Sequence, residues 1–71
     1  MRDMMYLIEA KVTIRVRGIS GPWEKIAGYL VEAGNQQEAQ RKFETQVKND
    51  NANMDAESFY FLYQRFFPTL K

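Results

Sequence analysis

The sequence contains neither cysteine nor histidine, and these two absences exclude several classes of protein. Without cysteine, no disulfide can stabilise the fold, and no thiol can act as a nucleophile. Without histidine, the chain lacks the commonest general base at neutral pH and the commonest transition-metal ligand. We therefore expect no metal site, no cofactor and no catalytic residues, and the lack of cysteine favours a cytoplasmic protein.

Long hydrophobic runs and a large net charge are also missing. The first apolar run follows Asp3 and stops at Glu9, after five residues, so we expect no signal peptide. No stretch of the sequence approaches the roughly 18 consecutive apolar residues of a membrane-spanning helix. Ten basic and nine acidic residues give a net charge of +1, so the chain as a whole has no electrostatic preference for nucleic acid or anionic lipid.

The length of the chain predicts a single domain. Its 71 residues provide one hydrophobic core but not two, so we assign residues 1–71 to one domain. The content of 45% hydrophobic and 27% charged residues is that of an ordinary globular protein. A core of this size leaves only about 3–5 kcal/mol of net stability. With disulfides and metals excluded, we expect self-association to supply additional stability.

Two segments in the first half of the chain have the character of β-strands. Tyr6–Arg17 alternates between apolar and polar residues, with Leu7 as the exception, which predicts a strand with one buried face. Gly18–Pro22 then has the composition of a hairpin loop. Trp23–Ala33 is rich in β-favouring residues and predicts a second strand, in which Gly28 is a candidate position for a bulge.

A helix is predicted after the second strand. Asn35 is a favourable N-cap residue, and Glu38 lies three positions later, as in a capping box. Ala39, Phe43 and Val47 then recur every four residues and form a narrow apolar stripe, which is typical of a helix that covers a sheet with one side. The polar segment 49–53 has turn composition and ends the helix.

The segment 55–67 is compatible with two structures. Its high aromatic content favours a strand, whereas most of its apolar residues share one side of a helical wheel. A third strand, reached from the second through the helix, would give an antiparallel sheet in the order 2-1-3 with the most regular strand at its centre. We therefore predict an α+β fold of ββαβ type with one helix on one face of a three-stranded sheet. The alternative is ββαα, with residues 55–67 helical.

The order strand, strand, capped helix, strand resembles a plan that is common among small ribosomal and phage-encoded proteins. Residues 31–39, which join the predicted second strand to the helix, resemble the same joint in those proteins. The resemblance lies in the pattern of elements and assigns no function. A ribosomal relative would be expected to have a more basic surface than this chain.

The remaining polar residues form no recognisable catalytic motif. Gly18-Ile19-Ser20-Gly21 does not have the glycine spacing of a phosphate-binding loop, and we interpret it as a turn. The acidic residues Asp50, Asp55 and Glu57 lack the spacing of a calcium-binding loop. We therefore expect that the protein is not an enzyme.

One candidate site is a basic face on the first strand. Lys11, Arg15 and Arg17 share the polar side of that strand, and Trp23 follows the hairpin loop. Residues two apart on a strand are separated by about 6.6–6.8 Å, so the basic groups could follow a single-stranded backbone while an aromatic ring stacks on a base. The alternative is that these charges form ordinary cross-strand ion pairs with glutamates.

The other candidate site is aromatic. The chain has five Phe, four Tyr and one Trp, and six of these lie between Phe59 and Phe67. A core this small cannot bury all of them, and exposed aromatic residues beside arginine are typical of protein interfaces. The residues that we assign to this interface are Phe59, Phe61, Tyr63, Arg65 and Phe67. The alternative is that the aromatic residues fill the core.

These observations favour a non-catalytic interaction protein of the adaptor or inhibitor type, such as phages and mobile elements encode. We expect it to form a homodimer through its C-terminal aromatic segment. The alternative function is binding of single-stranded nucleic acid, RNA in particular, through Lys11, Arg15, Arg17 and Trp23. We expect no association with membranes and no bound metal.

Overall fold

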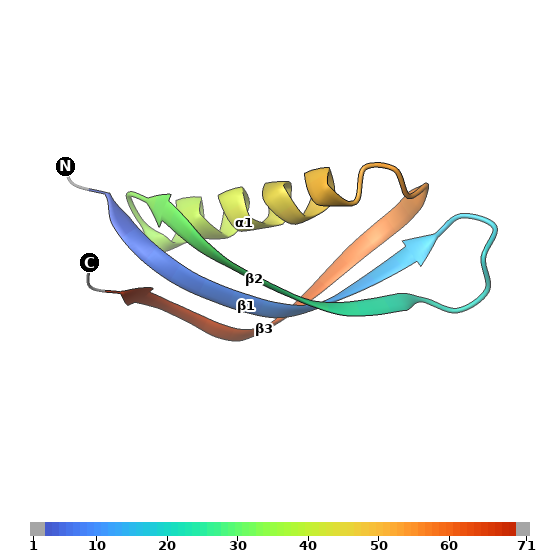
Figure 1. Cartoon of the computed structure of the whole chain (residues 1–71), viewed down its shortest axis with the longest axis horizontal. Coiled ribbons are helices and arrows are strands. Elements are labelled where there is room, and N and C mark those ends of the chain that lie inside the picture. The colour runs from blue at the N-terminus through green and yellow to red at the C-terminus, as the bar shows by residue number, and fades with distance from the viewer. Residues whose placement is uncertain (1–2, 70–71) are drawn as a thin grey trace.

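One three-stranded antiparallel sheet and one helix make up the fold. The computed structural model describes residues 3–69, and the elements are β1 (Met4–Val16), β2 (Trp23–Ala33), α1 (Gln36–Asp50) and β3 (Ala56–Thr69). The strand order is β2-β1-β3, and the helix lies along one face of the twisted sheet (Figure 1). The predicted ββαβ fold with order 2-1-3 is confirmed, and the alternative with a helix at residues 55–67 is wrong.

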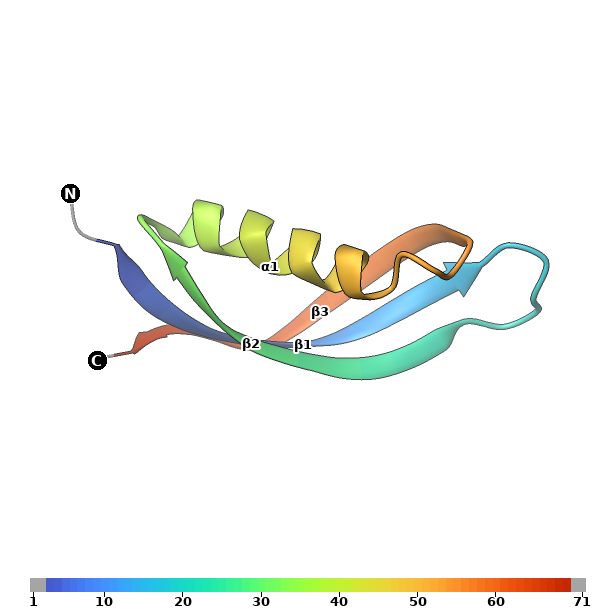
Figure 2. The same ribbon diagram turned by 45° about the horizontal axis from the view of Figure 1, so that its top comes forward.

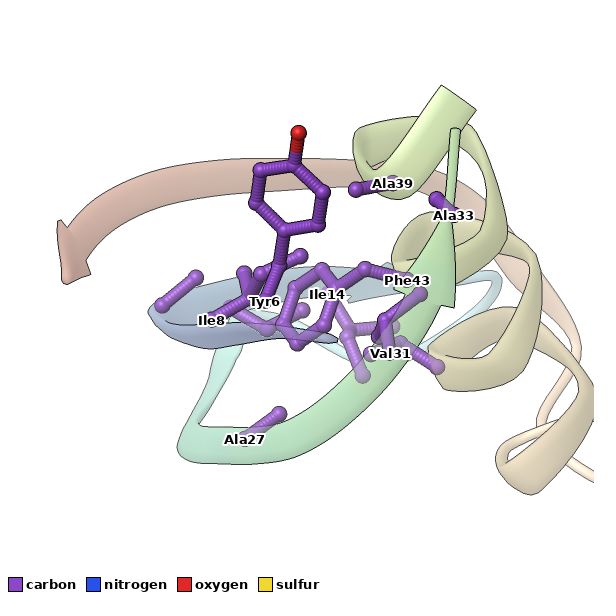
Figure 3. Packing of buried hydrophobic residues seen from close by; sticks show 11 residues of the cluster. Tyr6, Ile8, Ile14, Ala27, Val31, Ala33, Ala39 and Phe43 are labelled. Atoms are coloured by element: carbon purple, nitrogen blue, oxygen red, sulfur yellow. The ribbon is translucent and has the colours of Figure 1, made fainter. Parts of the chain in front are cut away.

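The core lies between the helix and the sheet. The side chains of β1 alternate as predicted, and every second residue from Tyr6 to Ile14 is buried. The helix contributes its predicted stripe of Ala39, Phe43 and Val47, and β2 contributes mainly small residues. Figure 3 shows these side chains meeting between the two layers. Because β1 is paired on both sides and covered by the helix, it is the best-buried element of the molecule.

The helix begins at the predicted cap. The Asn35 side chain accepts a hydrogen bond from the Glu38 N–H at 2.8 Å, and the Glu38 carboxylate accepts one from the Gly34 N–H at 2.6 Å. These bonds satisfy backbone donors that have no partner inside the helix. At the other end, the Asn51 side chain donates to the Val47 carbonyl at 2.7 Å. Polar residues at both ends therefore fix the length of α1.

Aromatic side chains connect the helix to both edge strands. The Phe43 ring on α1 lies 5.8 Å from the Tyr29 ring on β2, 6.1 Å from the Phe61 ring and 5.9 Å from the Tyr63 ring on β3, measured between centroids. The helix backbone lies closer to β2 than to β3. The space between α1 and β2 is therefore filled by small side chains of β2, whereas the wider space between α1 and β3 is filled by aromatic rings of β3.

The third strand departs from regular pairing at two places. Arg65 is the partner of Glu9 and Tyr63 the partner of Ala10, so Gln64 is an extra residue in β3. A second shift lies between the partners of Arg15 and Val16. The register between β1 and β2 is continuous across Gly28. The prediction of Gly28 as a candidate bulge position is therefore wrong. The bulges lie on the other edge strand, where they are common.

The hairpin between β1 and β2 extends beyond the helix (Figure 2). Gly18 and Gly21 have φ values of 82° and 83°, a conformation that glycine adopts readily. The backbone N–H of Arg17 donates to the Asp55 carbonyl at 2.8 Å and connects the hairpin to the start of β3. Within residues 3–69, no helix has the length and apolar character needed to cross a membrane.

Candidate interaction surface

The helix covers one face of the sheet, and no other element in the described part of the chain, residues 3–69, lies over the opposite face (Figures 1 and 2). We call the uncovered side the open face. The strand registers place on it the residues that alternate with the buried ones. From β1 these are Met5, Leu7, Glu9, Lys11, Thr13 and Arg15; from β2 Glu24, Ile26, Gly28, Leu30 and Glu32; and from β3 Ser58, Tyr60, Leu62, Arg65, Phe67 and Thr69.

Five large apolar side chains on this face are exposed. They are Ile26, Leu30, Tyr60, Leu62 and Phe67, which we call the apolar patch, with exposed fractions from 44% for Phe67 to 64% for Tyr60. Side chains of this size have on the order of 200 Å² of surface each, so the patch leaves on the order of 500 Å² of apolar surface in contact with water. The five side chains lie on the two edge strands, with Leu7, Glu9 and Lys11 of β1 between them. Their summed area is comparable with that of the largest apolar patch on a typical monomeric protein, about 300–600 Å².

The charges on the open face are balanced and mostly paired. Lys11 and Glu24 form an ion pair of 3.3 Å between β1 and β2. Arg65 and Glu9 form another of 3.4 Å between β3 and β1. With Arg15 and Glu32 included, the open face carries three basic and three acidic side chains. It therefore attracts neither polyanions nor polycations as a whole.

The five residues predicted to form an aromatic interface are divided between the two faces. Phe59, Phe61 and Tyr63 pair with buried residues of β1, lie on the helix side and pack against the core. Arg65 and Phe67 lie on the open face. The five residues therefore do not form one surface: Phe59, Phe61 and Tyr63 help to fill the core, and the interface remains a prediction for Arg65 and Phe67.

The predicted basic face is also divided. The register pairs Trp23 with Ile14, whose side chain is fully buried, so Trp23 belongs to the helix side of the sheet and not to the open face. Lys11 is paired with Glu24, and Arg17 lies 3.3 Å from the Asp55 carboxylate and 3.5 Å from that of Glu57. Of the three predicted basic residues, Arg15 alone makes no ion pair within residues 3–69.

Sequence reasoning did not select four members of the apolar patch: Ile26, Leu30, Tyr60 and Leu62. The signal for Ile26 and Leu30 was present, because they occupy the opposite parity of β2 from Trp23, Ala27, Val31 and Ala33. Successive residues of a strand point to opposite faces of the sheet. When both alternating sets of positions hold apolar residues and only one face is covered, one set must lie exposed on the other face. The exposure of Tyr60 and Leu62 could not be recognised from the sequence, because the residues next to them in β3 are apolar as well.

Two tyrosines on the helix side bind carboxylates of the helix. The hydroxyl of Tyr29 donates to Asp50, and that of Tyr63 donates to Glu44. The pKa of Tyr29 is raised, mainly by its hydrogen bond to Asp50. The pKa of Tyr63 is raised further, first by burial and then by its bond to Glu44. Each bond joins one edge strand to α1, so we assign both to the stability of the fold.

No group of three or more acidic, histidine or cysteine side chains within residues 3–69 is placed to hold a metal ion. Comparison with protein-family models, curated proteins and solved structures found no match for this chain. The open face and its apolar patch are therefore the candidate functional surface of this chain.

Proposed function

We propose that this chain is a non-catalytic protein-interaction module that self-associates and binds through the open face of its sheet. The apolar patch carries the proposal. Antiparallel sheets with one covered face usually present polar side chains on the other, whereas here Ile26, Leu30, Tyr60, Leu62 and Phe67 are exposed from both edge strands.

The size of the patch supports a protein partner. One partner in a standard interface contributes about 800 Å², and about 65% of a homodimer interface is apolar. The apolar contribution of one subunit is therefore on the order of 500 Å², the same as the estimated area of the patch. Two aromatic side chains in the patch and Arg65 beside it belong to the residue types that are enriched at interface centres.

The balanced charge of the open face supports the same proposal against nucleic-acid binding. Binding to a nucleic-acid backbone depends on basic groups that are free to replace counterions. Lys11 is paired with Glu24 and Arg65 with Glu9, so most basic groups on this face already have acidic partners. A protein partner, by contrast, can bind the open face without breaking either of these two ion pairs.

A substitution within the patch tests the proposal. Leu62→Lys places a charge where the interface should be dry, and Thr45→Lys makes the same change of charge on the outer surface of α1. Sedimentation equilibrium from about 1 µM to about 1 mM covers binding free energies of roughly −8 to −4 kcal/mol. We expect the unmodified chain and Thr45→Lys to associate in this range, and Leu62→Lys to remain monomeric with an unchanged circular dichroism spectrum.

Two results would contradict the proposal. A chain that is strictly monomeric up to the highest concentration would exclude self-association. Association that Leu62→Lys leaves unchanged would place the contact somewhere other than the open face.

A further inference from the structure

We infer that the open face binds a second copy of this chain across a two-fold axis that crosses the strands between Glu9 and Lys11. The inference rests on the proposed function, because it specifies the partner and the geometry for the same surface. It is carried by two independent features of the open face: the order of charges on the central strand and the position of a glycine on β2.

The charge order on β1 is self-complementary. Glu9 and Lys11 are successive open-face residues of the central strand, about 6.6–6.8 Å apart. In the proposed dimer, two sheets pack face to face, and the two-fold axis lies between them, perpendicular to the strands. Rotation about this axis reverses the direction of the strands in the second copy and keeps each strand opposite the same strand of the partner. With the axis midway between these residues, Glu9 faces the partner's Lys11, and Lys11 faces the partner's Glu9. Both charges at the centre of the interface then have opposite charges across it.

Gly28 is explained by the same axis. It lies beside Glu9 in the β1–β2 register, and Ile26 lies beside Lys11. The axis therefore brings the exposed Ile26 side chain of each copy over the partner's Gly28, where no side chain occupies the surface. Glycine in the middle of a strand weakens the strand and often marks the close approach of another molecule.

Within residues 3–69, no contact or backbone angle requires a glycine at position 28. Its φ is not positive, and a Cβ at this position would meet only the Ile8 carbonyl oxygen, at an ordinary contact distance of 3.8 Å. Neither backbone conformation nor internal packing accounts for the residue. The close approach of a second subunit does account for it.

In the next rows, the β3 side places two aromatic residues together, whereas the β2 side places Glu24 opposite the partner's Leu30. The row of Thr13 contains Tyr60, and the row of Leu7 contains Phe67, so the axis brings Tyr60 near the partner's Phe67. Packed sheets are rotated by about 30° relative to each other, so the rows nearest the axis face each other most directly. The central rows of Glu9 and Lys11 are therefore the ones to test.

Charge reversal in two separate variants provides the test. In Glu9→Lys, a homodimer would place two lysines opposite each other at each contact, and in Lys11→Glu it would place two glutamates. We expect each variant to dimerise at least about tenfold more weakly than the unmodified chain. In an equimolar mixture, every central contact of the heterodimer again joins opposite charges. We therefore expect mixing to restore the dimer, measured by sedimentation equilibrium with one variant labelled.

The mixture also controls for effects inside each chain. Glu9→Lys breaks the pair with Arg65, and Lys11→Glu breaks the pair with Glu24, and both pairs stay broken after mixing. Recovery can then come only from contacts between chains. If either variant dimerises as tightly as the unmodified chain, or if the mixture associates no more tightly than the separate variants, the two-fold arrangement is wrong.

Gly28→Val provides a second measurement, because it should not lower the stability of the monomer but should weaken the dimer. A β-branched residue should favour the strand, so thermal stability of the monomer should be unchanged or higher, whereas the dimer should weaken because the partner's Ile26 loses its space. A Gly28→Val dimer as tight as the original would overturn the inference.

The outcomes also separate this inference from the proposed function. If these tests fail but Leu62→Lys still abolishes association, the proposed function stands and the two-fold arrangement is wrong. A strictly monomeric unmodified chain would overturn both the inference and the proposed function.

Discussion

Phe43 is the side chain on which contact between the helix and the sheet depends most. It is fully buried, and its ring contacts aromatic rings on both edge strands. No other residue of α1 reaches both sides of the sheet through aromatic contacts. Loss of this ring would leave a cavity between the two layers, lined by Tyr29, Phe61 and Tyr63.

We expect Phe43→Ala to lower the free energy of unfolding by about 3–5 kcal/mol, the usual cost of removing a buried phenylalanine. A domain of this size has about that much net stability, so the variant should be largely unfolded at 25 °C. Urea unfolding followed by circular dichroism would measure the loss. Phe43→Leu should retain the fold with a smaller loss. A Phe43→Ala variant as stable as the original chain would show that the contact is not central.

Tyr63 should make stability depend on alkaline pH. Burial and the bond to Glu44 raise the pKa of its hydroxyl in the folded state, so the folded protein retains this proton at a pH where the unfolded chain loses it. The resulting stabilisation is complete below the unfolded pKa of about 10 and is lost as the pH rises through the folded value.

The comparison with Tyr63→Phe isolates this effect, because other groups also titrate at alkaline pH. Near pH 8 the variant should lose about 0.5–1.5 kcal/mol, the net contribution of one hydrogen bond. Between about pH 10 and pH 11.5 the difference between the two proteins should decrease, since the unfolded original chain loses the Tyr63 proton there while the folded protein retains it. A difference that stays constant over this range would contradict the assignment.

At the scale of elements, the N-cap of α1 has a predictable contribution. Asn35→Ala removes the acceptor for the Glu38 N–H and should lower the free energy of unfolding by about 1 kcal/mol. Asn35→Ser preserves a capping oxygen and should retain most of the stability. Urea unfolding of the two variants measures the difference directly. Equal stabilities would mean that the side-chain cap contributes nothing.

Three of the four elements could be predicted from the sequence because local signals agree there. The alternation of β1, the turn residues after it and the cap of α1 each point to one structure. β3 was ambiguous for an identifiable reason. The extra residue Gln64 shifts the phase of the strand, so Tyr63 and Phe66 lie on the same face although they are three positions apart. Spacing of three imitates helical periodicity, and a bulge cannot be located without knowing the partner strand.

The candidate surface was less predictable than the fold. Which parity of β3 faces the helix depends on its register with β1, and register is a tertiary property. The prediction therefore selected an aromatic segment without separating Phe59, Phe61 and Tyr63, which face the helix, from Phe67, which does not. The expectation that some aromatic residues remain exposed stands for Tyr60 and Phe67.

At the scale of the whole molecule, the helix covers only part of the sheet. Fifteen residues of α1 extend about 22 Å at 1.5 Å per residue, whereas the molecule is 45 Å long. No other element of residues 3–69 covers the opposite face of the sheet. The fold thus leaves large apolar side chains exposed to water on that face, and self-association would bury them.

The charge of the open face predicts weak binding to nucleic acid. Since three basic and three acidic side chains share this face, a short single-stranded RNA should not bind with micromolar affinity even at about 50 mM salt, where phosphate contacts are strong. Fluorescence anisotropy of a labelled oligonucleotide would measure this. Affinity that falls steeply with rising salt would instead support the basic face of Lys11, Arg15 and Arg17.

The location of the interface can be measured most directly by nuclear magnetic resonance with a soluble paramagnetic agent, at low and high protein concentration. The methyl groups of Ile26, Leu30 and Leu62 report on the open face, and the comparably exposed Ile19 in the hairpin is the internal control. We predict that the three patch residues become protected from the agent as concentration rises, while Ile19 stays accessible. Equal accessibility of the patch at both concentrations, or protection confined to Ile19, would contradict binding through the open face.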